Sequence, residues 1–196
     1  MAFTFIVEDG TIVAGANSYV TVSYADDYIG ENKFASPSWN ALGTTDKQLM
    51  LAWATRYLDQ RATWNGQTTA TYLANPDSVN VVAGFVTYPS NVTVPQQPLR
   101  WPRANVFDVD KNPIPYNVIP TQLMQATAEM ARYLIASDRS LERPQDGLKE
   151  LKIDVMTLIF RENYILPIVP SEIGYIIRGL GMISSGRTGF GKITRT

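Results

Sequence analysis

Three kinds of side chain could do chemistry in this chain: carboxylates, basic groups and hydroxyls. The sequence contains no histidine and no cysteine, which excludes a Ser-His-Asp triad, a thiol nucleophile, a disulfide and the common zinc and iron ligand sets. The 18 carboxylates and 17 basic groups could still build a metal site or an acid–base pair. No acidic pair stands in a distinctive local motif, however, so we expect a protein that is not an enzyme and holds no cofactor.

Two segments come close to ligand-binding loops and fail at demanding positions. Residues 186–192 match most of a phosphate-binding loop, but Ile193 replaces the hydroxyl needed for magnesium and no helix can follow. Residues 108–112 copy the first ligands of a calcium loop, but Pro113 replaces the required glycine and Ile119 replaces the bidentate glutamate. We therefore expect a terminal arm at the first segment and a polar turn at the second.

Several aromatic residues could stack on the bases of single-stranded nucleic acid. Such a site needs a basic groove alongside, whereas the charged residues nearest the first helix, at positions 26, 27 and 31, are acidic. We therefore expect these aromatic residues in the core or at a subunit contact. They are Tyr24, Tyr28, Trp39 and Trp53.

The segment Gln97–Arg103 combines two prolines, a tryptophan and two arginines. Proline fixes its own backbone and keeps the preceding residue extended, so we expect a rigid loop anchored by a buried Trp101. The two arginines could contact phosphate or pair with carboxylates of a neighbouring subunit, and the acidic balance of the chain favours the second. The predicted structural anchor or subunit interface is Arg100, Trp101, Pro102 and Arg103.

The charges of the chain are distributed unevenly. Residues 1–172 hold 13 basic and all 18 acidic side chains and carry −5, whereas residues 173–196 carry +4 and six of the 13 glycines. We expect residues 184–196 to form a flexible basic arm, with a frayed terminus as the alternative. Apolar residues spaced among the charges favour an arm that docks on a partner. The predicted partner-binding residues are Arg187, Phe190, Lys192, Ile193 and Arg195.

The elements that must position these residues begin with helices. Residues 3–14 alternate weakly around Asp9-Gly10 and predict a short hairpin. Thr21 is predicted to cap a first helix with an apolar face of Val22, Ala25 and Ile29.

A second helix is predicted from the capping box of Thr45 and Gln48. It carries two adjacent apolar stripes, which predict burial on more than one side. The stripes are Leu49, Trp53 and Tyr57, and Met50, Ala54 and Leu58. Trp64-Asn65-Gly66 predicts the turn that ends this unit.

The rest of the chain alternates between strand and helix patterns. Residues 67–98 predict a β-rich insertion, with a strand over 79–88 and a possible partner at 92–94. A third helix is predicted over Thr121–Ala136, and residues 149–160 predict a strand or hairpin. Ser171 is predicted to cap a short last helix. The buried residues expected in these two helices are Leu123, Thr127, Met130 and Leu134, then Ile173, Ile176, Ile177 and Leu180.

Together these patterns predict an α+β protein that is mainly α. We expect one domain over residues 1–183, which includes the β-rich insertion at 67–98, followed by the extended C-terminal arm. The start of the chain shows no basic region before an apolar run, so no signal peptide is expected. No apolar stretch reaches 18 residues, so we expect a soluble protein without a membrane partner.

Four blocks of this sequence together resemble a known family. They are Asn17-Ser18-Tyr19-Val20, the pair Ala54–Asp59 and Trp64-Asn65-Gly66, Gln97–Arg103, and Ile114-Pro115 with Ile119-Pro120. In this order they resemble a phage-encoded family labelled DnaT-like single-stranded-DNA-binding proteins, whose members stand among the head–tail adaptor, or head-completion, proteins of tailed phages. The resemblance covers about residues 17–135, and the Trp-Pro-Arg block is its most specific part.

The resemblance implies a small helical bundle with a β-hairpin. It also implies a virion protein made in the host cytoplasm and located at the head–tail neck. Copies would form a ring of about twelve subunits around the channel for genomic DNA, with the portal protein and a tail terminator or other tail component as partners. The C-terminal arm would reach the portal. The alternative is a replication accessory protein that binds single-stranded DNA, as the family label says. The net acidic charge of residues 1–172 favours the adaptor, because proteins that bind single-stranded DNA contact its phosphates through a basic groove.

Overall fold

The computed structural model describes residues 3–74, 81–82, 85–86, 96–136, 138, 150–153, 156–159 and 168–183. Its helices are α1 (Val22–Gly30), α2 (Ser36–Asn40), α3 (Thr44–Arg61), α4 (Thr69–Ala74), α5 (Thr121–Ala136) and α6 (Ser171–Ile176). The protein is α+β and mainly α, as predicted.

The strands are short and pair two by two. They are β1 (Ala62–Trp64), β2 (Gln67–Thr68), β3 (Val81–Val82), β4 (Phe85–Val86), β5 (Arg103–Ala104), β6 (Val106–Phe107), β7 (Pro113–Ile114), β8 (Glu150–Ile153), β9 (Met156–Ile159) and β10 (Gly181–Ile183). Every pair is antiparallel: β1–β10, β2–β5, β3–β4, β6–β7 and β8–β9.

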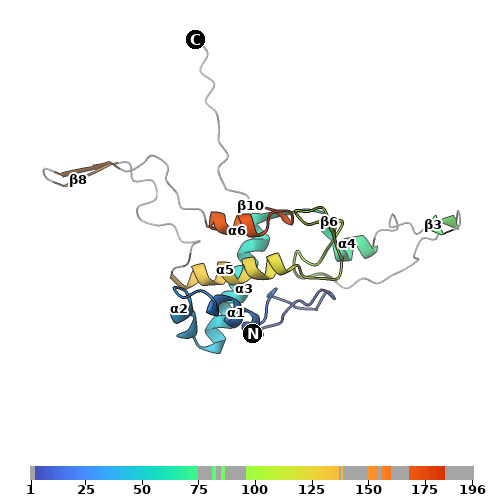
Figure 1. Cartoon of the computed structure of the whole chain (residues 1–196), viewed down its shortest axis with the longest axis horizontal. Helices are drawn as coiled ribbons and strands as arrows, with labels where there is room; N and C mark the ends of the chain where they lie inside the picture. The colour runs from blue at the N-terminus through green and yellow to red at the C-terminus, as the bar shows by residue number, and fades with distance from the viewer. Residues whose placement is uncertain are drawn as a thin grey trace, which may run out of the picture.

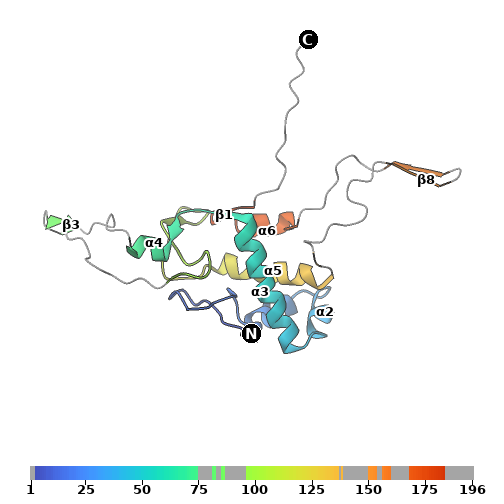
Figure 2. The ribbon, with the colours of Figure 1, turned by 180° about the vertical axis from the view of Figure 1, so that it is seen from behind.

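The core lies where the long helices α3 and α5 cross. Figures 1 and 2 show α5 lying across α3, with α1 and α2 at one end of α3 and α6 near the other. Leucines and isoleucines of α3, α5 and α6 are fully buried at these contacts, and each buried large aliphatic side chain contributes about 1.5–3 kcal/mol. The crossing is therefore the main source of stability in the described body. Its central side chains are Leu51, Leu58, Leu123, Met130 and Ile173.

The predicted cap of α1 and the predicted span of α5 are confirmed. Helix α5 spans Thr121–Ala136, and all four predicted core residues, at positions 123, 127, 130 and 134, are buried. Thr21 caps α1 by accepting a hydrogen bond from the Tyr24 N–H at 3.1 Å, and Ala25 and Ile29 are buried. These features depend on local sequence, which explains why local patterns predict them.

The predictions for α3 need two corrections. The helix begins at Thr44 after Gly43, without a side-chain cap, so the predicted capping box at Thr45 is wrong. In the first predicted stripe Leu49 and Trp53 are exposed but Tyr57 is buried. In the second stripe Ala54 and Leu58 are buried and Met50 is partly buried. Neighbouring elements cover only one side of the helix. The buried residues of α3 are Leu51, Ala54, Thr55, Tyr57 and Leu58.

The segment before α1 also differs from its prediction. Residues 3–14 form no hairpin, and the one bridge there pairs Val7 with Ser18 in parallel. The carboxylate of Glu8, which is 2% exposed, accepts hydrogen bonds from the N–H groups of Gly10, Ile12 and Val13 at 2.9–3.0 Å. These bonds fold the segment around a buried side chain, so its backbone does not pair with itself.

The insertion contains a helix that the sequence pattern did not predict. Helix α4 follows β2 directly, where residues 67–98 were predicted to be β-rich. Within 79–88 the described residues form the hairpin β3–β4 in place of one strand, and the proposed partner at 92–94 lies outside the described residues.

Two further predictions concern the last third of the chain. The β8–β9 hairpin confirms the predicted hairpin at 149–160. The last helix begins at Ser171, but Pro170 is its N-cap residue and no side-chain cap is present, so the predicted Ser171 cap is wrong. Ile173, Ile177 and Leu180 are buried and Ile176 is partly buried, but the helix ends at Ile176, so Ile177 and Leu180 follow it and do not belong to it as predicted.

None of the helices in the described parts of the chain has the length and apolar character needed to cross a lipid bilayer.

Candidate functional site

Three of the sequence blocks that resemble the family meet in one polar network. The Tyr19 hydroxyl donates to Asp59 Oδ1 at 2.7 Å and accepts from the Trp101 N–H at 3.1 Å. The Arg100 N–H donates to Asp59 Oδ2 at 3.0 Å. Thus α3 and the segment before α1 together hold the start of the Trp-Pro-Arg loop. We call these four residues the Tyr19–Asp59 network.

Trp101 is fully buried, as predicted. Its ring packs edge to face against Trp64, with ring centres 5.9 Å apart, and the Trp101–Pro102 peptide bond is cis. Neither indole N–H finds an acceptor among the described residues. Packing and the backbone hydrogen bond to Tyr19 therefore hold Trp101, which makes it an anchor of the loop.

Arg103 binds the backbone of its own chain. Its guanidinium donates to the carbonyl oxygens of Asn65 at 2.6 Å, Gly66 at 2.7 Å and Arg100 at 3.1 Å. Only 9% of the residue is exposed, and Pro102 beside it is also buried. Arg103 therefore acts as a structural anchor within the subunit, whereas the Arg100 side chain is exposed.

The turn at Asn65-Gly66 connects this network to the C-terminal part of the described chain. Gly66 has φ +66°, and a Cβ there would lie 2.2 Å from the Ala104 carbonyl oxygen. The Asn65 N–H donates to Leu180 O at 2.9 Å, and its side-chain amide donates to Gly179 O at 2.7 Å. The turn needs glycine because β5 passes directly beside it.

Burial changes the acid–base properties of the network. Burial raises the pKa of Asp59 from 3.8 to about 6, although the hydrogen bond from Tyr19 opposes this shift. Burial and the neighbouring carboxylate raise the pKa of the Tyr19 hydroxyl well above 10, and burial lowers the pKa of Arg103. Tyr19 and Asp59 are hydrogen-bonded to each other, so their shifts indicate a structural network whose stability depends on pH.

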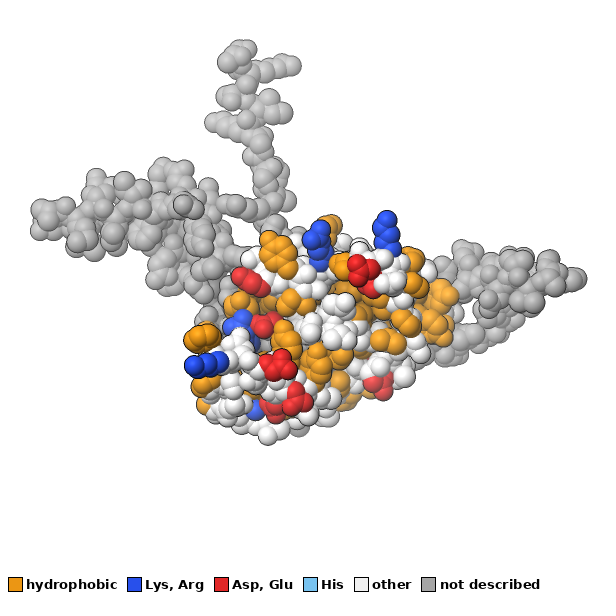
Figure 3. Space-filling view, viewed as in Figure 1, with side chains coloured by type: hydrophobic (Ala, Val, Ile, Leu, Met, Phe, Trp, Pro, Cys, Tyr) orange, Lys and Arg blue, Asp and Glu red, His pale blue; other side chains and the backbone are white. Residues whose placement is uncertain are grey.

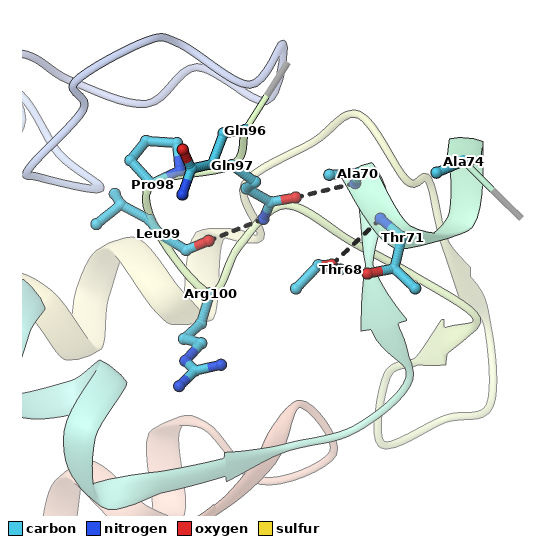
Figure 4. Close-up of a pocket in the computed structure, with 9 residues that line it drawn as sticks. All are labelled: Thr68, Ala70, Thr71, Ala74, Gln96, Gln97, Pro98, Leu99 and Arg100. Atoms are coloured by element: carbon cyan, nitrogen blue, oxygen red, sulfur yellow. Dashed lines mark hydrogen bonds between the residues drawn. The ribbon is translucent and has the colours of Figure 1, made fainter. Parts of the chain in front are cut away.

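A cavity of about 550 Å³ lies beside the Trp-Pro-Arg loop (Figure 4). Gln97 closes one side, because its amide oxygen accepts the Ala70 N–H while its amide nitrogen donates to Leu99 O and Pro102 O. Arg100 is the one cation among the described residues of the lining. A single cation supplies little affinity for a phosphate backbone. The lining residues are Thr68, Ala70, Thr71, Ala74, Gln96, Gln97, Pro98, Leu99 and Arg100.

The four aromatic residues considered for base stacking have different surroundings. Trp39 is fully buried, and its indole N–H donates to Asp26 at 2.7 Å. Tyr24 and Tyr28 are partly buried and stack on each other, with ring centres 6.3 Å apart. Trp53 is 37% exposed, so it is the member of this set with an accessible ring.

The polar turn predicted at residues 108–112 is confirmed. The Asp108 carboxylate accepts hydrogen bonds from the Asp110 and Asn112 N–H groups and from the Asn112 side chain. These bonds lower the pKa of Asp108. No cluster of three acidic side chains suited to a metal ion occurs within the described ranges.

The residues predicted to bind a partner through the C-terminal arm lie outside the described residues, and so does the segment that resembles a phosphate-binding loop. They are Arg187, Phe190, Lys192, Ile193 and Arg195.

Comparison with known proteins places the chain in a family. The family model described as "Putative DnaT-like ssDNA binding protein" matches residues 3–97 and 78–196. The chain belongs to this family. No curated protein and no solved structure matches the chain significantly.

Sequence reasoning marked the blocks of this DnaT-like protein but missed the partnership of Tyr19 with Asp59. The available signal was a carboxylate, Asp59, directly after the buried residues of α3. A carboxylate beside a buried helix face needs hydrogen-bond donors, and the sequence does not say which segment supplies them.

Proposed function

We propose that the protein is a structural subunit of the head-to-tail adaptor of a tailed phage. Copies would form a ring around the DNA channel, between the portal protein and a tail component. The observation that carries this proposal is the position of the β8–β9 hairpin, which stands apart from the helical body in both views (Figures 1 and 2). An isolated two-stranded hairpin is marginally stable in water. A surface on another subunit or partner would stabilise it.

The surface of the described body favours contacts with proteins over binding of single-stranded DNA. On the face shown in Figure 3, basic side chains stand singly among hydrophobic ones and form no continuous track. Residues 1–172 carry −5, and a net acidic wall around a channel repels duplex DNA and lets it slide. The predicted contacts with DNA are therefore non-specific.

A second candidate function is a replication accessory protein that binds single-stranded DNA. The description of the matching family favours this function directly. The basic residues for such binding would come mainly from residues 173–196, which carry +4. Binding through that segment would depend steeply on salt, because counterions are released from the phosphates.

Two measurements on the full chain separate these functions. Light scattering and negative-stain electron microscopy report whether copies assemble into rings, and fluorescence anisotropy reports binding of a labelled single-stranded oligonucleotide. The adaptor predicts rings, negligible binding near 0.15 M salt, and weak binding at low salt that is lost in a chain ending at Ser184. A monomer that binds the oligonucleotide at micromolar concentration or tighter, with or without residues 185–196, would establish the second function instead.

A further inference from the structure

Phe34 has the largest exposed fraction among the large hydrophobic residues of the described chain, at 91%. It lies between α1 and α2, where the Asn32 carboxamide oxygen accepts the Phe34 N–H at 3.0 Å and so shapes the turn. Glu31 and Lys33 beside it are exposed, and neither forms an ion pair within the described ranges. Phenylalanine is enriched in the buried centres of protein interfaces, so this exposed ring could supply a contact if a partner covers it.

The outer face of α3 is the second unusual surface. Asp46, Leu49, Trp53 and Arg56 follow one another at spacings of three and four residues, so they lie on one side of the helix. Leu49 is 43% exposed, and the Arg56 guanidinium lies over the Trp53 ring, 4.7 Å from its centre. Neither charged residue has an ion-pair partner among the described residues. This face therefore presents an apolar centre between an acidic end and a basic end.

The charges on the two surfaces are complementary. The turn carries an acid, Glu31, then a base, Lys33, and the α3 face carries Asp46 at one end and Arg56 at the other. Ten helical residues span about 15 Å, and two residues of turn span at most about 7 Å. The long side chains of lysine and arginine can span the difference between these two lengths. If the turn and the α3 face lie against each other, one ion pair would form on each side of the apolar contact.

We propose that the Phe34 turn of one copy docks on the Leu49–Trp53 face of the next copy. Glu31 would pair with Arg56 and Lys33 with Asp46. The two surfaces belong to different parts of the chain, the turn between α1 and α2 and the outer face of α3 (Figure 2). Such a heterologous contact repeats from copy to copy and closes into a ring when the rotation allows. The proposal rests on the proposed function and names the subunit contact within it.

A charge exchange in the full chain tests this contact. Phe34→Ser should weaken assembly about 30-fold or more, as expected for a central aromatic contact. Arg56→Glu should also weaken it, and adding Glu31→Arg to that variant should restore assembly. Met182→Ser is the matched control, since Met182 is 73% exposed on β10 and outside both surfaces. Light scattering over a dilution series gives the fraction assembled, and circular dichroism verifies folding.

The outcomes distinguish this proposal from the proposed function. If the parent assembles and Phe34→Ser and Arg56→Glu assemble equally well, the contact is wrong and the ring lies elsewhere. If the parent chain is monomeric at every concentration, the proposed function fails and the contact fails with it. If Trp53→Ala weakens oligonucleotide binding and leaves assembly unchanged, the α3 face binds nucleic acid and the proposal is overturned.

Discussion

Two regions of this protein use a tryptophan with an arginine close behind it, and the two pairs have opposite surroundings. Trp101 is fully buried, and the Arg103 guanidinium donates to three backbone carbonyls. Trp53 is 37% exposed, and Arg56 lies over its ring without a carboxylate partner among the described residues. Both pairs consist of the same two residue types, so residue type does not explain why one pair is buried and the other exposed. The elements packed around each pair explain the difference.

The comparison shows that the residues recognisable as family blocks and the residues of the exposed contact surfaces are different residues. The blocks that resemble the family build the Tyr19–Asp59 network and its turn, so they specify a fold. The surfaces free to contact a partner, the Phe34 turn and the outer face of α3, carry no motif. A family match based on the blocks that build the network therefore says little about which surfaces bind a partner.

The largest expected effect follows from exchanging the two tryptophans for alanine. Trp101→Ala should lower the free energy of unfolding by about 3–5 kcal/mol, because a buried aromatic ring is lost and a cavity remains. Trp53→Ala should cost about 1 kcal/mol, since part of its ring is already in water. Urea denaturation followed by circular dichroism measures both values. Equal costs would contradict the contrast between the regions.

The pH dependence of stability tests the Tyr19–Asp59 network. The pKa of Asp59 is about 6 in the folded chain against an ordinary 3.8, so between these values the folded state binds more protons. The contribution of Asp59 to the free energy of unfolding therefore falls by about 3 kcal/mol as the pH rises from about 4 to above 6.

Asp59→Asn is the control for this pH effect, because asparagine does not titrate. The difference in unfolding free energy between parent and variant, measured from pH 4 to pH 7.5, should follow the predicted curve. A constant difference over this range would show that burial of the carboxylate is not coupled to stability.

A matched pair of arginine substitutions has a smaller expected effect. Arg103→Lys should cost about 2 kcal/mol, because an ammonium cannot reproduce the planar fork that reaches three carbonyls. Arg56→Lys should change stability by less than about 0.5 kcal/mol, since the residue is exposed. Thermal unfolding of both variants checks this prediction. A cost at Arg56 as large as that at Arg103 would place Arg56 in the fold.

The smallest effect on stability is expected at Phe34. Its ring is 91% exposed, so Phe34→Ser should leave the free energy of unfolding of the dissociated chain within about 0.5 kcal/mol of the parent. The same variant should lose assembly, as proposed above. Unfolding at concentrations below assembly separates the two quantities. A loss of stability in the monomer would mean that Phe34 packs within its own chain.

Local sequence determined the parts of this protein whose interactions are local. The period of 3.6 residues placed α5, the Thr21 hydroxyl began α1, Asp108 formed its polar turn, and strand alternation placed the hairpin β8–β9. In each case the bonding groups lie within a few residues of one another. The composition also determined which reactive groups exist, because histidine and cysteine are absent.

The tertiary structure decided what distant segments share. The apolar residues of α3 are spread over two stripes, and only the packing of α5 and α1 selected which of these residues are buried. Gly66 and Asn65 form their tertiary contacts only because β5, which includes Arg103, and the turn before β10 lie beside them. The pairing of β1 with β10 joins segments far apart in the chain. Such choices depend on hydrogen bonds and buried area between remote residues, and no local pattern encodes those partners.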